Sequence, residues 1–202
     1  MKRPQVESRI AEALKSYPKG SILFVDDFLD YGSPDSVKKA LMRLKEKELL
    51  VRLAHGIYYY PKIDNELGIL FPSTEDIAFA IARRDKSRIV PTGIQALNKL
   101  GLSTQVPMRV VYLTDGAART IKVGKRTITF KKTSPKNLIV KGEKSGLAIQ
   151  ALKTIGQEKV DEKTTEKIQA ILRSEKKENI IHDAKISPAW INKFLMKALK
   201  SH

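Results

Sequence analysis

The stretch that decides the fold runs from Ser33 to Pro61 and reads SPDSVKKALMRLKEKELLVRLAHGIYYYP. Ser33 can accept hydrogen bonds from the free amides at the start of a helix, and Pro34 has no amide to leave unpaired at the first helical position. Four apolar residues then recur at the spacing of one buried helix face: Val37, Ala40, Leu41 and Leu44. The pattern predicts a helix from Pro34 to about Lys47.

Two short strands joined by a tight turn are predicted directly after this helix. Residues 49–53 and 57–60 are mostly apolar, and Ala54, His55 and Gly56 lie between them. Pro61 cannot donate a ladder hydrogen bond, so the second strand should stop there. Its three tyrosines, 58–60, could stack on bases, although we expect two of them to pack along the hairpin. The pattern predicts a β-hairpin that would serve as a wing.

The residues before Ser33 supply the remaining elements. Apolar residues at helical spacing predict a helix over residues 5–16, and an apolar run predicts a short strand over 22–25. Asp26 or Asp27 can then cap a short second helix. Helix, strand, helix, turn, helix and hairpin is the element order of a winged helix-turn-helix, which we expect over residues 1–62.

Residues 73–202 predict a second domain, so that the fold class of the whole chain is α+β. Helical and β-branched runs alternate up to a hairpin around Gly124, and the remainder of the chain is helical. We expect helices over residues 75–84, 91–100, 147–155, 164–172 and 187–199, and strands over 88–90, 108–113, 121–123 and 128–130. Charged residues dominate 173–185, which we expect to be a mobile connection.

The composition indicates a folded protein with an anionic partner. Of 202 residues, 42% are hydrophobic, and 38 Lys and Arg against 22 Asp and Glu give a formal net charge of +16. This excess, spread over the whole chain, favours nucleic acid, an anionic membrane surface or an acidic protein as the partner. No apolar run reaches the roughly 20 residues of a membrane span, and no secretory leader is visible, so we expect a cytoplasmic protein.

The sequence does not indicate catalytic chemistry. Cysteine is absent, and the three histidines lack metal-ligand spacing. Residues 142–146 lack the leading glycine of a phosphate-binding loop. Asp26 and Asp27 are better explained as a helix cap than as a catalytic pair, and residues 114–116 as a turn. We therefore expect no enzyme activity, cofactor or metal.

The outward face of the helix over residues 34–47 supplies the candidate DNA contacts. In a helix-turn-helix, the second helix of the motif enters the major groove and its outward residues reach base edges. The expected base-edge contacts are Ser36, Lys39 and Arg43. The expected phosphate contacts are Lys38 and Arg52, and His55 at the wing tip should contact phosphate or the minor groove. The alternative is that these cations form only a solvated surface.

A second basic surface is expected at the hairpin around Gly124. Its members are Lys122, Lys125, Arg126 and Lys131, close in sequence to Arg119 and Lys132. Alternation along the strands should turn four apolar side chains inward, those of Ile121, Val123, Ile128 and Phe130. Lys122 and Lys131 should then share the outer face. This surface could extend a DNA contact, dock an acidic partner protein or simply be solvated, and all three remain open.

Two sets of residues resemble AbiEi-type antitoxins of bacterial abortive-infection systems, which are type IV toxin–antitoxin systems. The first set, SPDSVKKAL at 33–41, RL at 43–44 and GIYYYP at 56–61, resembles the N-terminal winged helix of that family. The second set, PTG at 91–93, ALN at 96–98, LGLSTQ at 100–105 and VYLTDG at 111–116, resembles its second domain. The resemblance covers roughly residues 1–140.

This resemblance implies a repressor that binds inverted DNA repeats upstream of its own operon. It also implies a neighbouring gene for a nucleotidyltransferase-like toxin, which a type IV antitoxin need not bind directly. By this resemblance, residues 36–43 correspond to the recognition helix of the family, and Arg52 and His55 correspond to its wing. The resemblance implies no catalytic residue. The rival interpretation is a protein-interaction module, in which the basic second domain binds an acidic partner and the winged helix is a scaffold.

Overall fold

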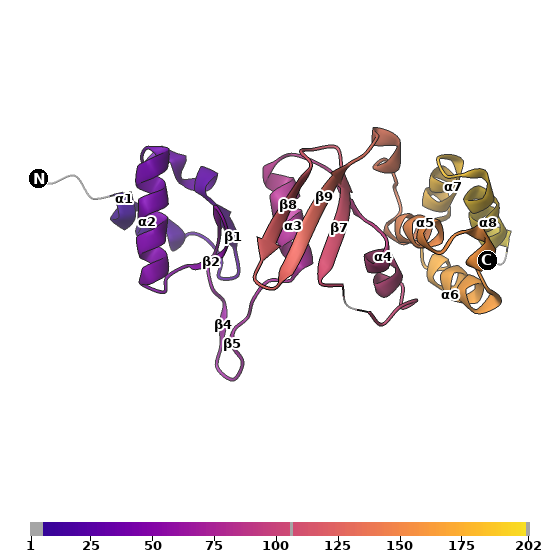
Figure 1. The fold of residues 1–202 in the computed structure, drawn as a ribbon, viewed down its shortest axis with the longest axis horizontal. Helices are drawn as coiled ribbons and strands as arrows, with labels where there is room; N and C mark the ends of the chain where they lie inside the picture. Colours follow the sequence, from indigo (N-terminus) through magenta and orange to yellow (C-terminus); the bar gives the residue numbers. More distant parts are fainter. Residues whose placement is uncertain (1–5, 106, 201–202) are drawn as a thin grey trace, which may run out of the picture. The chain divides into compact units, whose positions relative to one another are not determined.

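The computed structural model describes residues 6–105 and 107–200 and confirms the predicted α+β class. The chain divides into two compact units (Figure 1). The first comprises residues 1–80 together with 122–124, and the second comprises residues 81–121 and 125–202. Each unit is described separately below.

The first unit begins with three helical segments and a three-stranded antiparallel sheet. The elements are α1 (Val6–Leu14), β1 (Ile22–Phe24), the 3-10 helix η1 (Val25–Tyr31), α2 (Pro34–Glu46), β2 (Val51–Ala54) and β3 (Ile57–Tyr59). The sheet order is β1-β3-β2, so the strand before η1 pairs with the second strand of the hairpin. The predicted helix over 34–47 and hairpin over 49–60 are therefore present within one or two residues.

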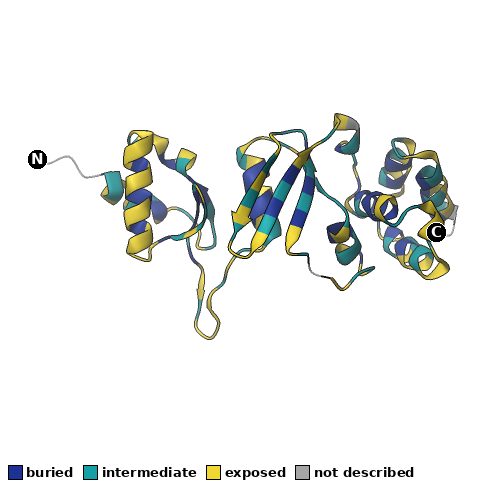
Figure 2. Ribbon diagram, in the orientation of Figure 1, coloured by how far each residue is buried: buried dark blue, intermediate teal, exposed yellow. Residues whose placement is uncertain are grey.

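The core of this unit lies between α1, η1 and α2. All four apolar residues predicted for one face of α2 are buried, with no more than 2% of any of them exposed. They pack with Ile10 and Leu14 of α1, with Phe28 and with Leu50. Full burial of a side chain of Leu or Ile size contributes about 1.5–3 kcal/mol, so this face fixes α2 on the unit and directs its polar face to solvent (Figure 2).

The predicted second helix differs in type and in its cap. Residues 25–31 form a 3-10 helix that begins one residue before Asp26. Asp27 is not the N-cap residue, which is Phe24. Asp27 is the third residue of the helix, and its carboxylate accepts a 2.7 Å hydrogen bond from the Phe24 amide. The carboxylate therefore satisfies the backbone just before the helix, which is the reciprocal half of a capping box.

A second, smaller hairpin in the first unit was not predicted. It consists of β4 (Ile63–Asp64) and β5 (Gly68–Ile69), which extend away from the three-stranded sheet (Figure 1). Ile63 pairs with Ile69, and Asp64 pairs with Gly68. Helix α3 (Thr74–Arg84) follows the hairpin and continues from the first unit into the second.

The second unit contains a four-stranded mixed sheet. Its elements are β6 (Ile89–Pro91), α4 (Ile94–Lys99), β7 (Arg109–Thr114), β8 (Arg119–Val123, of which residues 122–123 are counted with the first unit), β9 (Arg126–Lys132) and the 3-10 helix η2 (Pro135–Asn137). The strand order is β6-β7-β9-β8, with β7 and β9 parallel. Ile128 and Phe130 of β9 are buried as predicted, whereas Ile121 and Val123 of β8 are only half-buried because β8 is an edge strand.

The C-terminal part of the second unit is a bundle of helices. It consists of α5 (Glu143–Ile155), η3 (Gln157–Lys159), α6 (Glu162–Leu172), α7 (Lys177–Lys185) and α8 (Ala189–Lys200). The prediction of a mobile connection over 173–185 was wrong, because α7 occupies most of it. Ile180 and Ala184, one helical turn apart, are fully buried in the bundle core. None of the helices in the described part of the chain is both long and apolar enough to cross a membrane.

Candidate nucleic-acid interface

The polar face of α2 exposes all four residues predicted there. Ser36, Lys38, Lys39 and Arg43 are each exposed, because the opposite face of the helix is fixed in the core. The Ser33 hydroxyl caps the helix, accepting from the Ser36 amide at 3.4 Å and lying 2.9 Å from the Ser36 hydroxyl. Lys38 lies 3.6 Å from Asp35 in an exposed ion pair, which is weak and easily exchanged.

Arg43 is held on the α1 side of this face. Its guanidinium lies 3.7 Å from the Glu7 carboxylate, which also accepts a 2.5 Å hydrogen bond from Lys47. The hydrogen bond from Lys47, supported by the charges of both cations, keeps the pKa of Glu7 below its usual value. The side chain predicted to read a base edge is therefore already paired with a carboxylate from the first helix, 36 residues earlier in the sequence.

The turn of the β2–β3 hairpin contacts the other side of the α2 face. The Arg52 guanidinium lies 3.2 Å from His55 Nδ1 and 3.9 Å from the sulfur of Met42 on α2. Its Nε also donates to the Ala54 carbonyl at 3.3 Å, which holds the guanidinium against the turn. The structure thus brings the predicted residues Arg52 and His55 together and joins them to α2 through Met42, a residue that the sequence did not single out.

Lys39 lies on α2 before both of these clusters, three residues before Met42 and four before Arg43. Its side chain is exposed, and among the described residues it has no ion-pair partner. It is one turn after Asp35 and one turn before Arg43. A lysine in this position can reach a ligand without first breaking an internal ion pair.

The tyrosine triplet is not a stacking platform. Tyr58 and Tyr59 are each only 3% exposed, as expected for residues that pack along the hairpin. The ammonium of Lys19 lies 3.6 Å from the centroid of the Tyr60 ring, so that face is already occupied. This agrees with the prediction that at least two of the three tyrosines are structural.

The second basic surface is exposed as predicted but does not include Arg119. Lys122, Lys125, Arg126 and Lys131 are all exposed. Arg119 is half-buried, forms an ion pair with Asp85 and has its guanidinium 5.6 Å from the centroid of the Phe130 ring. The Thr120 and Thr129 hydroxyls lie 3.3 Å apart, which places both on the outer face of β8 and β9.

Residues 9–180 match a family described as one of unknown function, DUF6088. The chain belongs to the DUF6088 family. No curated protein matches the chain. Among solved structures, a crystal structure of the RV2827C protein from Mycobacterium tuberculosis matches at 13% identity and a TM-score of 0.48, covering 96% of this chain and 82% of that one.

In this DUF6088 chain, two carboxylates bind the backbone at the start of α5, in the segment 142–146 that lacks the leading glycine of a phosphate-binding loop. The buried Asp183 carboxylate accepts from the amides of Lys141 and Gly142 at 2.8 and 2.9 Å and from the Ser145 hydroxyl at 2.5 Å. Glu175 accepts from the Lys144 amide at 3.0 Å. The amides that would bind a phosphate are therefore occupied. A Cβ at Gly142 would collide with Ser145 and Glu175.

Glu175 should make the stability of this DUF6088 protein sensitive to acid. Burial raises the pKa of Glu175, but hydrogen bonds from Asn179 and from the amides of Lys176 and Lys144 outweigh burial and lower it. A carboxyl group with a lowered pKa stabilises the fold above its unfolded-state pKa, and that stabilisation is lost as the pH falls through the folded-state value. We expect the wild-type melting temperature to fall more steeply below about pH 4.3 than that of Glu175→Gln. Parallel melting curves from pH 7 to pH 3 would contradict this assignment.

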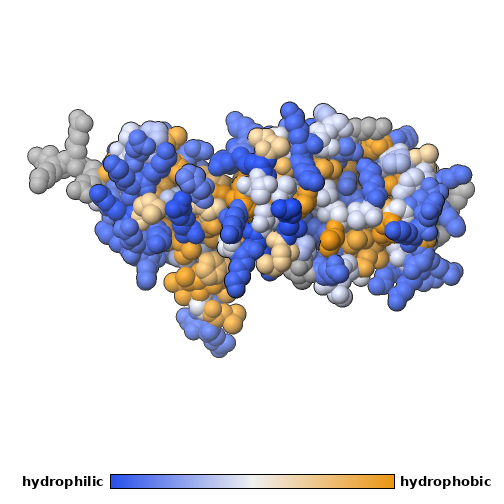
Figure 3. Space-filling view, viewed as in Figure 1, coloured by the Kyte–Doolittle hydropathy of each residue, from blue (hydrophilic) through white to orange (hydrophobic). Residues whose placement is uncertain are grey.

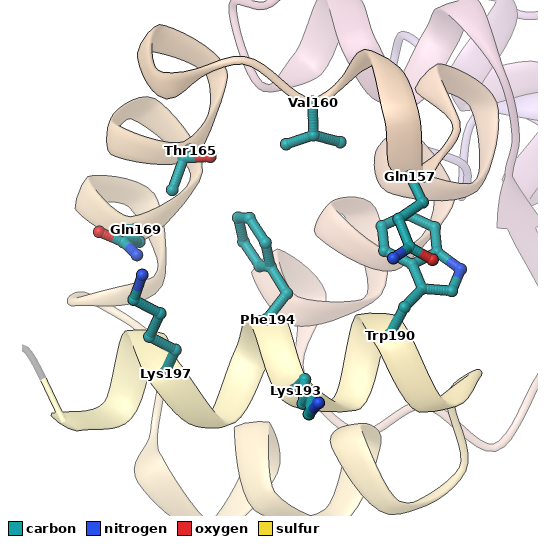
Figure 4. A pocket seen from close by; sticks show the side chains of 8 residues that line it. All are labelled: Gln157, Val160, Thr165, Gln169, Trp190, Lys193, Phe194 and Lys197. Atoms are coloured by element: carbon teal, nitrogen blue, oxygen red, sulfur yellow. The ribbon is translucent and has the colours of Figure 1, made fainter.

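A groove along α8 was not predicted, although the apolar spacing of Trp190 and Phe194 is visible in the sequence. It has a volume of about 480 Å³ (Figure 4) and is lined by Gln157, Val160, Thr165, Gln169, Trp190, Lys193, Phe194 and Lys197. The Phe194 ring points into it between α6 and the segment that carries Val160. No acidic side chain lines it, so this DUF6088 protein offers a groove with an apolar floor and two lysines.

Proposed function

We propose that this protein is a cytoplasmic, DNA-binding transcriptional autoregulator whose first unit acts as a winged helix-turn-helix. The observation that carries the proposal is the contact of Arg52 with both His55 in the hairpin turn and Met42 on α2. This contact makes the cations of the turn and those of the α2 face parts of one surface. Such a surface suits a DNA duplex, because a helix can enter the major groove while the hairpin follows the adjacent backbone.

The contacts within this surface suggest different roles for its cations. Lys39 has no internal ion-pair partner among the described residues and should donate to base edges. Lys38 and Arg52 should neutralise phosphates, which positions the protein without reading sequence. Arg43 is 3.7 Å from Glu7, so turning its guanidinium toward a guanine weakens that ion pair and offsets part of its binding free energy.

The proposal is tested by fluorescence anisotropy with the duplex upstream of the gene and a scrambled duplex of the same composition. Measurements at two salt concentrations separate phosphate contacts from base contacts, because only the former depend strongly on salt. We expect tight binding that persists at the higher salt only on the native duplex. Equal affinity for both duplexes, lost together as salt rises, would refute a sequence-reading function.

Release of Arg43 and Lys47 from Glu7 should strengthen binding. Glu7→Gln removes the negative charge that both cations neutralise. We expect its affinity for the native duplex to rise about two- to fivefold, as for the loss of one exposed ion pair. Glu12→Gln, on the same helix but paired only with Lys15 among the described residues, is the control and should leave affinity unchanged. An unchanged or weaker affinity for Glu7→Gln would show that Arg43 and Lys47 do not approach the duplex.

We further propose that the regulator is the antitoxin of a type IV toxin–antitoxin system and binds inverted repeats upstream of its own operon. This rests on the resemblance of residues 33–61 and 91–116 to AbiEi-type antitoxins. The test is growth of cells that express the neighbouring gene with and without this protein. Rescue of growth, together with repression of a reporter fused to the upstream DNA, would support both roles. Repression without rescue would leave a regulator that is not an antitoxin.

A second candidate function is docking of an acidic partner protein on the second unit, with the first unit as scaffold. The groove along α8 favours it, because Phe194 and Trp190 offer an apolar floor and Lys193 and Lys197 can meet carboxylates. An acidic amphipathic helix would suit this chemistry. If this candidate is correct, the double variant Lys193→Glu with Phe194→Ala should no longer rescue the growth of cells that express the neighbouring gene, and its DNA binding should be unchanged. The matched pair Lys122→Glu with Lys131→Glu tests the hairpin surface in the same assay.

A further inference from the structure

Met42 is an apolar residue near the middle of the solvent-facing side of α2. Its side chain is 36% exposed, and among the described residues it is not one of those that pack in or against the core of the first unit. Successive helical residues are about 100° apart, which places Met42 and Lys39 each roughly 30° from the direction opposite the buried face. By the same count, Ser36, Lys38 and Arg43 lie about 70–90° from that direction. Met42 and Lys39 therefore project furthest from the core.

The surroundings of Met42 on this face are polar. The residues one turn away on either side, Lys38, Lys39, Lys45 and Glu46, are all charged and exposed. Figure 3 shows a mainly hydrophilic surface where α2 lies in this view. Packing within the protein therefore does not explain why an apolar side chain stands here.

The hairpin turn supports Met42 from one side. The Arg52 guanidinium lies 3.9 Å from the Met42 sulfur, and it is itself held by the Ala54 carbonyl and by His55. A thioether sulfur is a weak acceptor, so this contact orients the side chain but offsets little of the cost of leaving it in water. An adaptable, polarizable methionine is typical of surfaces that fit themselves to a ligand.

The chemistry of the major groove indicates which ligand group covers Met42. This step rests on the proposed function, in which α2 lies in the major groove. Base edges there present hydrogen-bond donors, hydrogen-bond acceptors and one apolar group, the 5-methyl group of thymine. A thioether gains little from a donor or an acceptor, whereas contact with a methyl group removes apolar surface of both partners from water.

We propose that Met42 is a specificity-determining residue that contacts the 5-methyl group of a thymine in the recognised DNA. Lys39 lies three residues earlier on the same side of α2. Side chains three residues apart on a helix in the major groove can reach successive bases. Lys39 and Met42 therefore read adjacent base pairs, Lys39 by donating hydrogen bonds and Met42 by covering the methyl group.

Replacement of thymine by deoxyuridine tests this contact, because deoxyuridine lacks only the 5-methyl group. Each thymine of the upstream duplex is replaced in turn, and the affinity of the full chain is measured by fluorescence anisotropy. We expect one position in a half-site at which deoxyuridine weakens binding of wild type about three- to fivefold, as for burial of one methyl-sized group. At that position the same exchange should change the affinity of Met42→Ala by less than about 1.5-fold. The ratio of the two effects cancels any general loss from the broken contact with Arg52.

Three further variants separate the methyl contact from a structural role. Met42→Leu keeps an apolar side chain and should retain the loss on deoxyuridine, whereas the polar Met42→Gln should not. Met196→Ala is the matched control, because Met196 lies on α8 in the second unit and is 39% exposed, and it should behave as wild type. All four variants should keep the circular dichroism spectrum of wild type, since both methionines are exposed.

The outcomes distinguish failure of the Met42 assignment from failure of the regulator. If wild type prefers the native duplex but loses less than about twofold at every thymine, Met42 does not read a methyl group and the regulator stands. A loss on deoxyuridine that is equally large in Met42→Ala would also overturn the assignment, because another residue would then cover the methyl group. Equal affinity of wild type for the native and scrambled duplexes would refute the regulator and this role of Met42 together.

Discussion

Replacing Asp183 by alanine is expected to lower the free energy of unfolding of the second unit by about 4 kcal/mol. The carboxylate is fully buried and accepts from two amides, from the Ser145 hydroxyl and from His182 Nδ1 at 2.9 Å. Hydrogen bonds to a charged group contribute about 1.5–3 kcal/mol each, and an alanine leaves the buried Gly142 amide without this acceptor. The side chain also joins α7 to the start of α5, so its loss should loosen the helical bundle.

Urea unfolding followed by tryptophan fluorescence measures this effect. Trp190 is the only tryptophan of the chain and lies on α8, so the signal reports the second unit. Glu178→Ala is the matched control, because Glu178 is an exposed carboxylate on the same helix. Asp183→Asn retains one acceptor oxygen and should fall between wild type and Asp183→Ala. A loss below about 1 kcal/mol for Asp183→Ala would mean that water replaces the carboxylate at low cost.

Reversal of the charge at Lys39 is expected to weaken binding to the upstream duplex about 100-fold. The variant Lys39→Glu removes one donor to the base edges and places a carboxylate against the phosphates, and together these cost about 2–4 kcal/mol. It leaves the fold intact, because Lys39 is exposed and makes no ion pair among the described residues.

Lys185→Glu is the control for Lys39→Glu. It makes the same change in net charge at an exposed residue of α7, in the second unit. We expect its affinity to change less than threefold, as for a charge that acts only through the long-range field. Equal losses for both variants would show that affinity follows net charge alone and would exclude a specific role for α2.

Arg52→Ala should weaken binding to the native duplex and to the scrambled duplex by the same factor, because its proposed contact is with phosphate.

The sequence was sufficient to predict elements whose signals are local. Helix α2 was predicted because its cap, its proline and its apolar spacing all lie within twelve residues. Helix α7 was missed because Ile180 and Ala184 are its only fully buried apolar residues in the described structure, and its third buried residue, Asp183, looks like part of a charged linker. The β4–β5 hairpin was missed because its strands are two residues long and their apolar side chains are exposed, contrary to the rule that apolar residues mark the core.

The candidate interface shows the same limit. Exposure of Lys38, Lys39 and Arg43 follows from the helical spacing of the buried residues and was predicted. The pairing of Arg43 with Glu7 and the contact of Arg52 with Met42 join elements that are distant in sequence. Such contacts depend on tertiary packing, which no local pattern encodes. They nevertheless decide which cations are available to a ligand.

The strand order β6-β7-β9-β8 has a consequence for the order of folding. Strand β9 lies between β7 and β8 in the sheet, although β8 precedes it in the chain. During synthesis, β7 emerges from the ribosome before its parallel partner exists, and β8 cannot take that edge permanently without displacing β9. The β8–β9 hairpin can form first from local contacts and then dock as a unit on β7, a late and slow step because it closes a longer loop. Until Lys132 has been translated, the nascent chain therefore leaves the backbone groups of β7 unpaired along the edge that β9 covers in the folded sheet.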